Sequence, residues 1–173
     1  MESEVREMLA EQLKDAYSAE KQALRCMQKT LKMASAPALR EGIQMHIEQT
    51  QVQIERVEQA MEKLQIRPGR KVCEAMRGLV EEATHEIGEQ DGKGPILDLV
   101  IVASMQRIEH YEIAAYGTDI ALAEALGEQE VGRFADGNSR GGEADRSQAD
   151  HGHSARDHAC RYGRRGGGGI FHP

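Results

Sequence analysis

Three glutamates occupy positions where a helical sequence pattern should place apolar residues. Glu20 precedes Leu24 by one turn and follows Ala16 by another, at the centre of an apolar stripe with helical spacing. Glu109 and Glu112 lie one turn apart in a second stripe. Its other members are Val102, Met105, Ile113, Tyr116, Ile120 and Ala123. Because burying a carboxylate without a partner is strongly unfavourable, the pattern predicts that something compensates these three acids.

A metal cation would provide that compensation, since hard divalent and trivalent ions favour carboxylate oxygens. Di-iron helical bundles take one Glu from each of two helices and a Glu-x-x-His motif from each of the other two, all directed into the core. Glu20, Glu109 and Glu112 match part of this pattern, and His46 is the ligand that we expect from the segment 37–65. The sequence therefore predicts a two-metal site for iron or manganese.

Two weaker ligands and one alternative accompany this prediction. Gln53 shares the inward side of its segment with His46 and Thr50, whereas Glu48 has better ligand chemistry but lies off the apolar stripe. In the alternative, the buried acids belong to a metal-free hydrogen-bond network that involves Tyr17, His46 and Gln53. Tyr116 is expected to pack in the core.

The residues around these acids predict helices and no strands. Aromatic residues make up 3% of the chain and Trp is absent, so Leu, Ile, Val, Met and Ala must form the core. The expected helices, with Ser3 as the first N-cap and Gly127 as the last C-cap, cover 3–34, 37–65, 70–90 and 95–126. The fold class is all-α: a ferritin-like four-helix bundle in which 70–90 is a short crossover helix. His110 and Tyr111 fall outside the apolar stripe and are expected at the surface or between subunits.

The composition changes abruptly near residue 130. No Leu, Lys or Met occurs from Val131 onward, although ten of the 18 glycines do. We therefore predict a helical domain at 1–130 and a disordered Gly/Arg/His-rich tail at 131–173, with the fourth long helix missing or disrupted. A frameshift in the gene would explain the change. The alternative is a metal-binding or interaction segment, because the tail has four histidines, namely His151, His153, His158 and His172.

Charge and hydropathy exclude several classes of protein. Residues 1–130 carry a net charge of −9 and the tail carries +2, so nucleic acid is not expected as a partner. No stretch reaches the length of a membrane span, and the first residues lack the basic and apolar regions of a signal peptide, so a cytoplasmic protein is expected. The cysteines Cys26, Cys73 and Cys160 show no paired spacing and are expected to be reduced.

Four stretches of the chain carry a resemblance to a known family. They are Leu13 to Leu24 (LKDAYSAEKQAL), Gln53 to Val57 (QIERV), Cys73 to Met76 (CEAM) and Glu109 to Gly117 (EHYEIAAYG). The chain resembles the YciE/YciF family of bacterial ferritin-like proteins over residues 4 to about 130. The resemblance implies a helical bundle, often a homodimer, that is linked to bacterial stress responses and has a metal site but no assigned substrate. The C-terminus departs from the family's fourth helix.

Two functional hypotheses follow. In the first, a stress-response protein holds iron or manganese at Glu20, Glu109 and Glu112 and either oxidises ferrous iron or handles peroxide; the sequence does not select one activity. In the second, the chain is a metal-free, dimeric structural or interaction module. Because a bundle without its fourth helix leaves apolar surface uncovered, we also expect dimerisation, recruitment of another chain or low stability.

Overall fold

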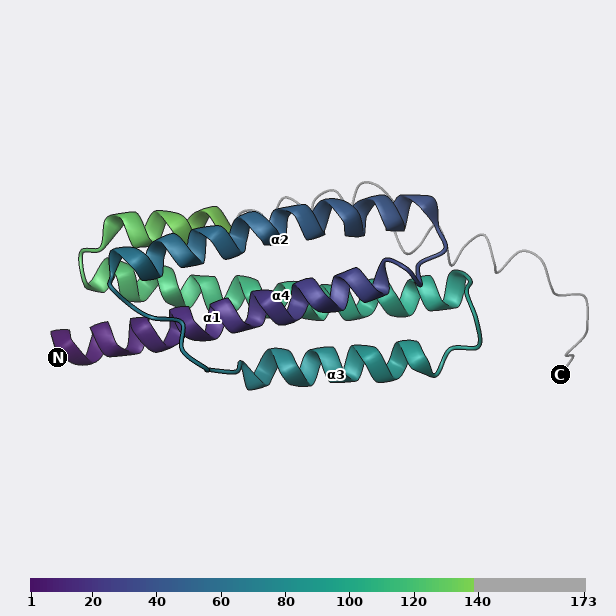
Figure 1. Ribbon diagram of the computed structural model, residues 1–173, viewed down its shortest axis with the longest axis horizontal. Coiled ribbons are helices and arrows are strands. Elements are labelled where there is room, and N and C mark those ends of the chain that lie inside the picture. Colours follow the sequence, from purple (N-terminus) through teal and green to yellow (C-terminus); the bar gives the residue numbers. More distant parts are fainter. Residues whose placement is uncertain (139–173) are drawn as a thin grey trace, which may run out of the picture.

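The computed structural model describes residues 1–138, which form long helices joined by short loops (Figure 1). The four longest are α1 (Glu2–Thr30), α2 (Pro37–Lys63), α3 (Glu74–Gly88) and α4 (Pro95–Ala125). The predicted all-α, ferritin-like class is confirmed. Within the described range, no helix combines the length and the apolar character needed to cross a membrane.

The order of the helices in space follows from one crossover. In Figure 1, α1 and α3 run in one direction, and α2 and α4 run in the other. Because α2 and α4 are parallel, a connection must return along the bundle between them, and α3 makes that return on the side of α1 and α4. The sequence prediction of a short crossover helix is therefore correct.

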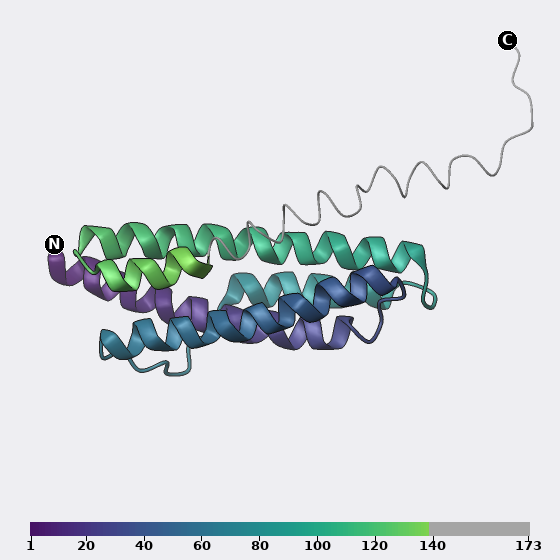
Figure 2. The ribbon, with the colours of Figure 1, turned by 90° about the horizontal axis from the view of Figure 1, so that it is seen from above.

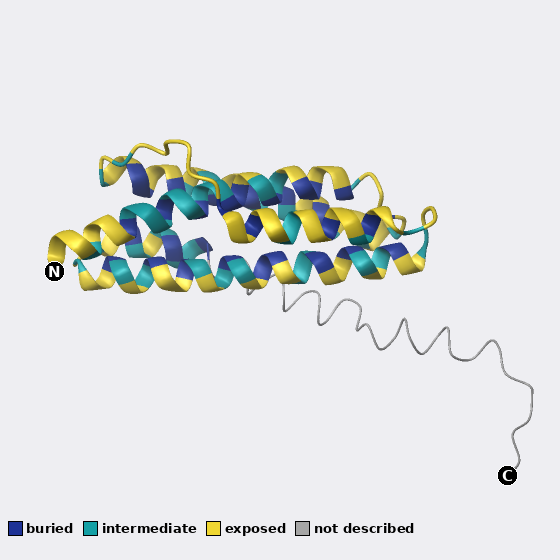
Figure 3. Cartoon of the chain, turned by 90° about the horizontal axis from the view of Figure 1, so that it is seen from below, coloured by how far each residue is buried: buried dark blue, intermediate teal, exposed yellow. Residues whose placement is uncertain are grey.

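The core lies along α1, which packs against the other three long helices. Small residues on α1, Ala16, Ala19 and Ala23, are each at most 4% exposed and let neighbouring helices approach closely. Larger side chains fill the remaining space around them, among them Leu9, Leu13, Met27, Met61, Met76 and Ile101. Figure 3 shows that buried residues line the facing sides of the helices and exposed residues the outer sides.

The first helix differs from expectation at both ends. It begins at Glu2 after Met1, with no side-chain cap, so Ser3 lies inside the helix and not at its N-cap. Its last regular residue is Thr30, and the chain then turns before α2. At the other end of the bundle, Gly127 adopts φ +70°, a left-handed conformation that favours glycine and ends α4 as predicted.

A carboxylate from α4 holds the loop before α2. Asp98 accepts hydrogen bonds from the backbone N–H groups of Ser35 (2.8 Å) and Ala36 (2.9 Å), and from the Ser35 hydroxyl (3.1 Å). The N-cap residue of α2, Ala36, has no polar side chain of its own. Asp98 therefore satisfies amides that the loop sequence leaves without a local acceptor.

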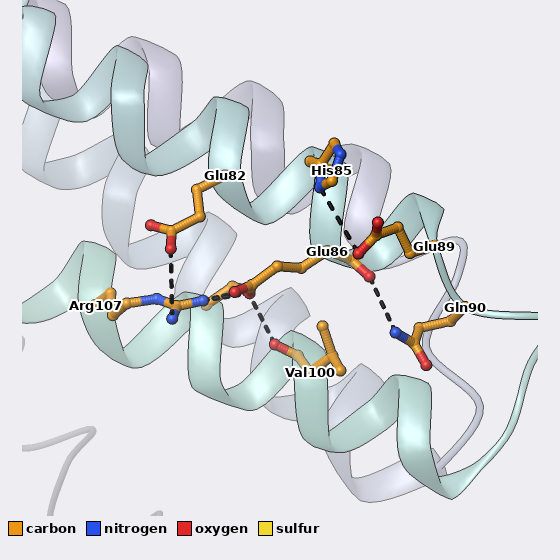
Figure 4. A network of polar contacts seen from close by, with 8 residues as sticks. Glu82, His85, Glu86, Glu89, Gln90, Val100 and Arg107 are labelled. Atoms are coloured by element: carbon orange, nitrogen blue, oxygen red, sulfur yellow. Dashed lines mark hydrogen bonds and ion pairs between the residues drawn. The ribbon is translucent and has the colours of Figure 1, made fainter.

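A surface ion network joins α3 to α4 (Figure 4). The Arg107 guanidinium forms an ion pair with Glu86 and lies 3.9 Å from a carboxylate oxygen of Glu82. The hydroxyl of Ser104, one turn before Arg107, donates to the Val100 carbonyl. Because the charged groups are substantially exposed, these ion pairs contribute little to the free energy of unfolding. We infer that the network mainly orients α3 relative to α4.

A further helix covers residues 129–138 and lies between α2 and α4 (Figure 2). Val131 is fully buried and Ala135 is 4% exposed, one turn further on, and Lys63 of α2 pairs with Glu130. This helix lies where the fourth helix of the bundle is expected to begin. It extends eight residues past the expected domain boundary at residue 130. Packing of its apolar side outweighs the low helix propensity of its two glycines. The rest of the predicted tail, including its four histidines, lies outside the described residues.

Candidate metal centre

The three predicted acids meet in the middle of the bundle. Glu20 projects from α1 and is 1% exposed, while Glu109 and Glu112 project from α4 and are each 5% exposed. Their places follow from helical spacing, because each lies one turn from buried apolar residues on its own helix. Gln53 of α2, at 5% exposed, is buried as well.

The electrostatics show that these acids act on one another. Burial raises the pKa of Glu112 well above its usual value, and the charges of Glu20 and Glu109 raise it further. Burial also raises the pKa of Glu20 to about 7, although a hydrogen bond from Tyr116 and the charge of His46 oppose this shift. Mutual repulsion of buried carboxylates is the condition under which either protons or a cation must neutralise them.

Several buried oxygen atoms on α1, α2 and α4 have no hydrogen-bond partner within the described part of the chain. They are the second carboxylate oxygen of Glu20, one oxygen of Glu112, the Thr50 hydroxyl and the Gln53 amide oxygen. Buried polar atoms are normally satisfied, and oxygens are the ligands that hard cations prefer. The chemistry of the Glu20 and Glu112 carboxylate oxygens therefore suits a hard metal ion. As the side chains stand, however, no three His, Cys, Asp or Glu residues within 1–138 are arranged to hold one.

Tyr116 has a role that the sequence pattern did not indicate. It is packed in the core as expected, at 2% exposed, and its hydroxyl donates a hydrogen bond to Glu20. Burial and the Glu20 charge raise the pKa of Tyr116, so the phenol keeps its proton. The spacing signal was present, because Tyr116 follows Glu112 by one turn.

The remaining candidates divide into those near the cluster and those away from it. His46 is half-buried and close enough to act on Glu20, whereas Glu48 is exposed and accepts a hydrogen bond from Gln44 at 3.0 Å. Gln53 is held by Asn138: its amide nitrogen donates to the Asn138 carbonyl at 3.4 Å. The structure thus brings His46 close to Glu20, buries Gln53 on the same helix and leaves Glu48 exposed.

One expectation about the surface is wrong. His110 is exposed as predicted, but Tyr111 is half-buried and points to α1 and to the start of α3. Its hydroxyl donates to Asp15 at 2.9 Å and lies 2.9 Å from the Cys73 sulfur. Helical spacing placed Tyr111 off the main stripe correctly, but α3 covers that side of α4 and encloses it.

The helical bundle and its buried acids define a ferritin-like protein. A family model described as "Domain of unknown function (DUF892)" matches residues 4–138. Protein YciF of Escherichia coli (strain K12) is 41% identical over 123 residues, which cover 70% of this chain and 74% of YciF. The chain therefore belongs to the DUF892 family, that of the YciE/YciF proteins.

Solved structures agree with this assignment. YcfI from Rhodopseudomonas palustris is 39% identical with a TM-score of 0.80, covering 84% of this chain and 92% of that one. The crystal structure of the E. coli stress protein YciF gives a TM-score of 0.80 at 32% identity, covering 94% of this chain and 98% of that one. A Xanthomonas campestris protein shares the fold, with a TM-score of 0.63 at 24% identity, over 92% of this chain and 94% of that one.

Proposed function

We propose that this chain is a stress-response protein whose buried carboxylate cluster binds a pair of iron or manganese ions. The observation that carries the proposal is the convergence of Glu20, Glu109 and Glu112, each at most 5% exposed, with carboxylate charges that act on one another. The stress-response context comes from the similarity to YciF of E. coli, which is described as a stress protein.

A cation would relieve two costs at once. Its charge would neutralise carboxylates that burial otherwise keeps protonated, and it would provide a partner for the bare oxygens of Glu20 and Glu112. Metal entry would therefore displace protons, and small side-chain rotations would have to bring the donors around one position. Glu20, Glu109, Glu112 and the His46 imidazole would be the ligands.

The surrounding residues would orient these ligands and exclude water. The Tyr116 hydroxyl holds one oxygen of Glu20 and leaves the other available. When bound, iron would supply one-electron redox chemistry, which serves either ferrous iron oxidation or peroxide disposal. Gln53, fixed by the backbone of Asn138, is the weaker oxygen donor.

Metal retention tests this proposal directly. The protein is dialysed against Mn²⁺ at neutral pH, and bound metal is measured by elemental analysis for wild type, Glu20→Gln and Glu109→Gln. Wild type is expected to retain Mn²⁺, and each variant to lose roughly tenfold or more in affinity because an anionic ligand is gone. Glu48→Gln is the matched control, since Glu48 is exposed on α2, and its retention should be unchanged. Equal retention in all four proteins, or none in wild type, would contradict the proposal.

We also propose that the chain forms a homodimer through the outer face of α4. This face is rich in exposed, uncharged residues at helical spacing: Leu99, Val102, Ala103, His110, Ala114, Gly117 and Ala121. Arg107 and Glu124 share that spacing. A side chain at Gly117 would meet nothing within 4 Å, so packing within one chain does not require glycine there. Exposed apolar residues that line up along one helix mark a surface that a partner can cover.

A second copy of the chain suits this face better than another partner. Residues 1–130 carry a net charge of −9, so two copies would repel one another least across a surface that carries few charges. A straight, largely uncharged strip along one helix is also self-complementary under a two-fold axis.

Sedimentation tests the dimer. Val102→Glu places a charge in the strip and should convert a wild-type dimer to a monomer, whereas Val52→Glu, on α2, should remain dimeric. Val102 and Val52 are 40% and 43% exposed, so the two changes are matched. A monomeric wild type, or a dimeric Val102→Glu variant, would contradict the proposed interface.

The metal-free structural module is the second candidate function, and the outer face of α4 is the observation that favours it. If wild type dimerises but retains no Mn²⁺, this candidate is supported and the metal proposal fails. In that case Glu20→Gln should keep or improve stability at neutral pH, because it removes a buried group that resists ionisation.

A further inference from the structure

The last turn of the helix at 129–138 lies against α2. Asn138, the last residue of this helix, is only 2% exposed, although its side chain is polar. The approach of the two helices is close, because a Cβ atom at Gly137 would lie 3.3 Å from a guanidinium nitrogen of Arg56. Glycine therefore allows this turn to reach α2, and Asn138 is enclosed between the helices.

The side-chain amide of Asn138 is bonded at both of its ends. Its Oδ1 atom accepts a hydrogen bond from the Arg56 guanidinium at 3.3 Å, and its Nδ2 atom donates to the backbone carbonyl of Gln53 at 3.3 Å. Because a guanidinium can only donate, the contact with Arg56 fixes which end of the amide carries the oxygen. The backbone carbonyl of Asn138 accepts in turn from the Gln53 side chain at 3.4 Å, so each of these two residues bonds to the backbone of the other.

Tyr116 of α4 is a further neighbour of Asn138. Both side chains line one small cavity, whose other walls are Arg56 and apolar residues of α1, α2 and the helix at 129–138. The Asn138 amide is a hydrogen-bond donor to the Tyr116 hydroxyl, and that hydroxyl donates to a carboxylate oxygen of Glu20. A hydroxyl can accept one hydrogen bond while it donates another, and bonds in such a chain strengthen one another. The chain runs from the helix at 129–138 through α4 to α1.

We propose that Asn138 is a positioning residue of the candidate metal centre, and that it acts through Tyr116 on Glu20. The inference rests on the proposed function, because it assigns a role within that same site. Asn138 fixes the Tyr116 hydroxyl, and Tyr116 holds one oxygen of Glu20. The other Glu20 oxygen, which has no hydrogen-bond partner within residues 1–138, then remains available to an ion. The helix at 129–138 thus completes the site without supplying a ligand.

Packing alone does not call for asparagine at this position. A leucine side chain has about the same size and would pack against the apolar walls of the cavity, which include Val57, Val131 and Phe134. Burying an amide is costly unless its hydrogen bonds are made, and Asn138 makes them to three different partners. What the amide adds over leucine is a fixed orientation of its neighbours, which is how residues behind a metal ligand contribute to affinity.

A double-mutant cycle in metal-free protein, measured by chemical denaturation, tests the hydrogen-bond chain. Asn138→Leu keeps the size of the side chain and removes its hydrogen bonds, and Tyr116→Phe removes only the hydroxyl. The effect of Asn138→Leu on the unfolding equilibrium constant should differ by at least about threefold between wild type and the Tyr116→Phe background, because residues in one network are not additive. Asn138→Ala replaces Asn138→Leu should the latter fold poorly. In the control cycle, Asn138→Leu and Asp98→Ala should be additive, since Asp98 lies about 27 Å from Tyr116 along α4.

The affinity for Mn²⁺ separates positioning from stability. Asn138→Leu should lower this affinity roughly tenfold, because a residue that orients a ligand is lost. Val131→Ala is the matched control: Val131 is buried on the same helix, so the change lowers stability, but the Mn²⁺ affinity should stay within about twofold of wild type. Additive effects in the cycle of Asn138 and Tyr116, an unchanged Mn²⁺ affinity in Asn138→Leu, or an equal loss in Val131→Ala would overturn the inference. If wild type retains no Mn²⁺, the proposed function fails, and the cycle alone decides whether Asn138 positions Tyr116.

Discussion

Replacing Asp119 by Asn should make the protein more stable in alkaline solution without a comparable gain in acid. Asn keeps the volume of the side chain but has no charge, so the change isolates ionisation. Burial and the neighbouring Asp15 raise the pKa of Asp119 from 3.8 to about 7. At about 1.4 kcal/mol per pKa unit, the ionised carboxylate costs the folded state up to about 4 kcal/mol.

The sign of the pH dependence follows from which state holds the proton longer. Between about pH 4 and about pH 7 the unfolded chain has lost the proton and the folded chain retains it, so wild-type stability falls as the pH rises. The amide introduced by Asp119→Asn would not titrate in either state. The stability difference in favour of the variant should therefore grow across this window and level off above about pH 8.

Urea denaturation followed by far-ultraviolet circular dichroism measures this difference at about pH 5 and about pH 8.5. Glu124→Gln is the control, because Glu124 is exposed on the same helix and should behave as wild type at both pH values. The free energy of unfolding of Asp119→Asn relative to wild type should rise by roughly 2–4 kcal/mol between the two conditions. Parallel pH profiles for variant and wild type would refute the assignment of a buried carboxyl group with a raised pKa at Asp119.

Three further predictions concern the remaining buried and loop contacts. Asp98→Ala should lower the free energy of unfolding by about 1–3 kcal/mol, because the amides of Ser35 and Ala36 lose their acceptor, and chemical denaturation measures this. Val131→Ala should lower the free energy of unfolding by roughly 1–3 kcal/mol in the same measurement, because Val131 is buried in the core. An unchanged free energy of unfolding would show that the helix at 129–138 is not part of the core. Glu112→Gln in metal-free protein should shift stability at neutral pH by less than about 1 kcal/mol, since burial already keeps Glu112 protonated.

Local periodicity was sufficient to predict much of the fold. The apolar spacing and the breaks at Pro37 and Pro95 located α2 and α4 closely. Proline suits the first turn of a helix, and the apolar spacing marks the side of each helix that packs in the core. The same spacing identified Glu20 and Glu112 as buried acids. These are properties of one helix at a time, which a sequence displays directly.

Other features depend on contacts between distant segments. The helix at 129–138 has weak intrinsic propensity and forms because Val131 and Ala135 pack against α2 and α4, which composition alone does not indicate. Tyr111 is enclosed only once α3 returns along α4. Asp119 did carry a signal, since it follows Glu112 by seven residues and so shares its side of α4. The Asp15 charge that acts on it comes from another helix, α1, and could not be inferred from α4 alone.

Anomalous X-ray diffraction from crystals soaked in Mn²⁺ tests the central claim most directly, because it locates the ion without reference to activity. We predict anomalous density enclosed by Glu20, Glu109 and Glu112, and its loss in crystals of Glu109→Gln. Manganese bound only at exposed surface carboxylates, with no density between these three residues, would contradict a metal site in the bundle.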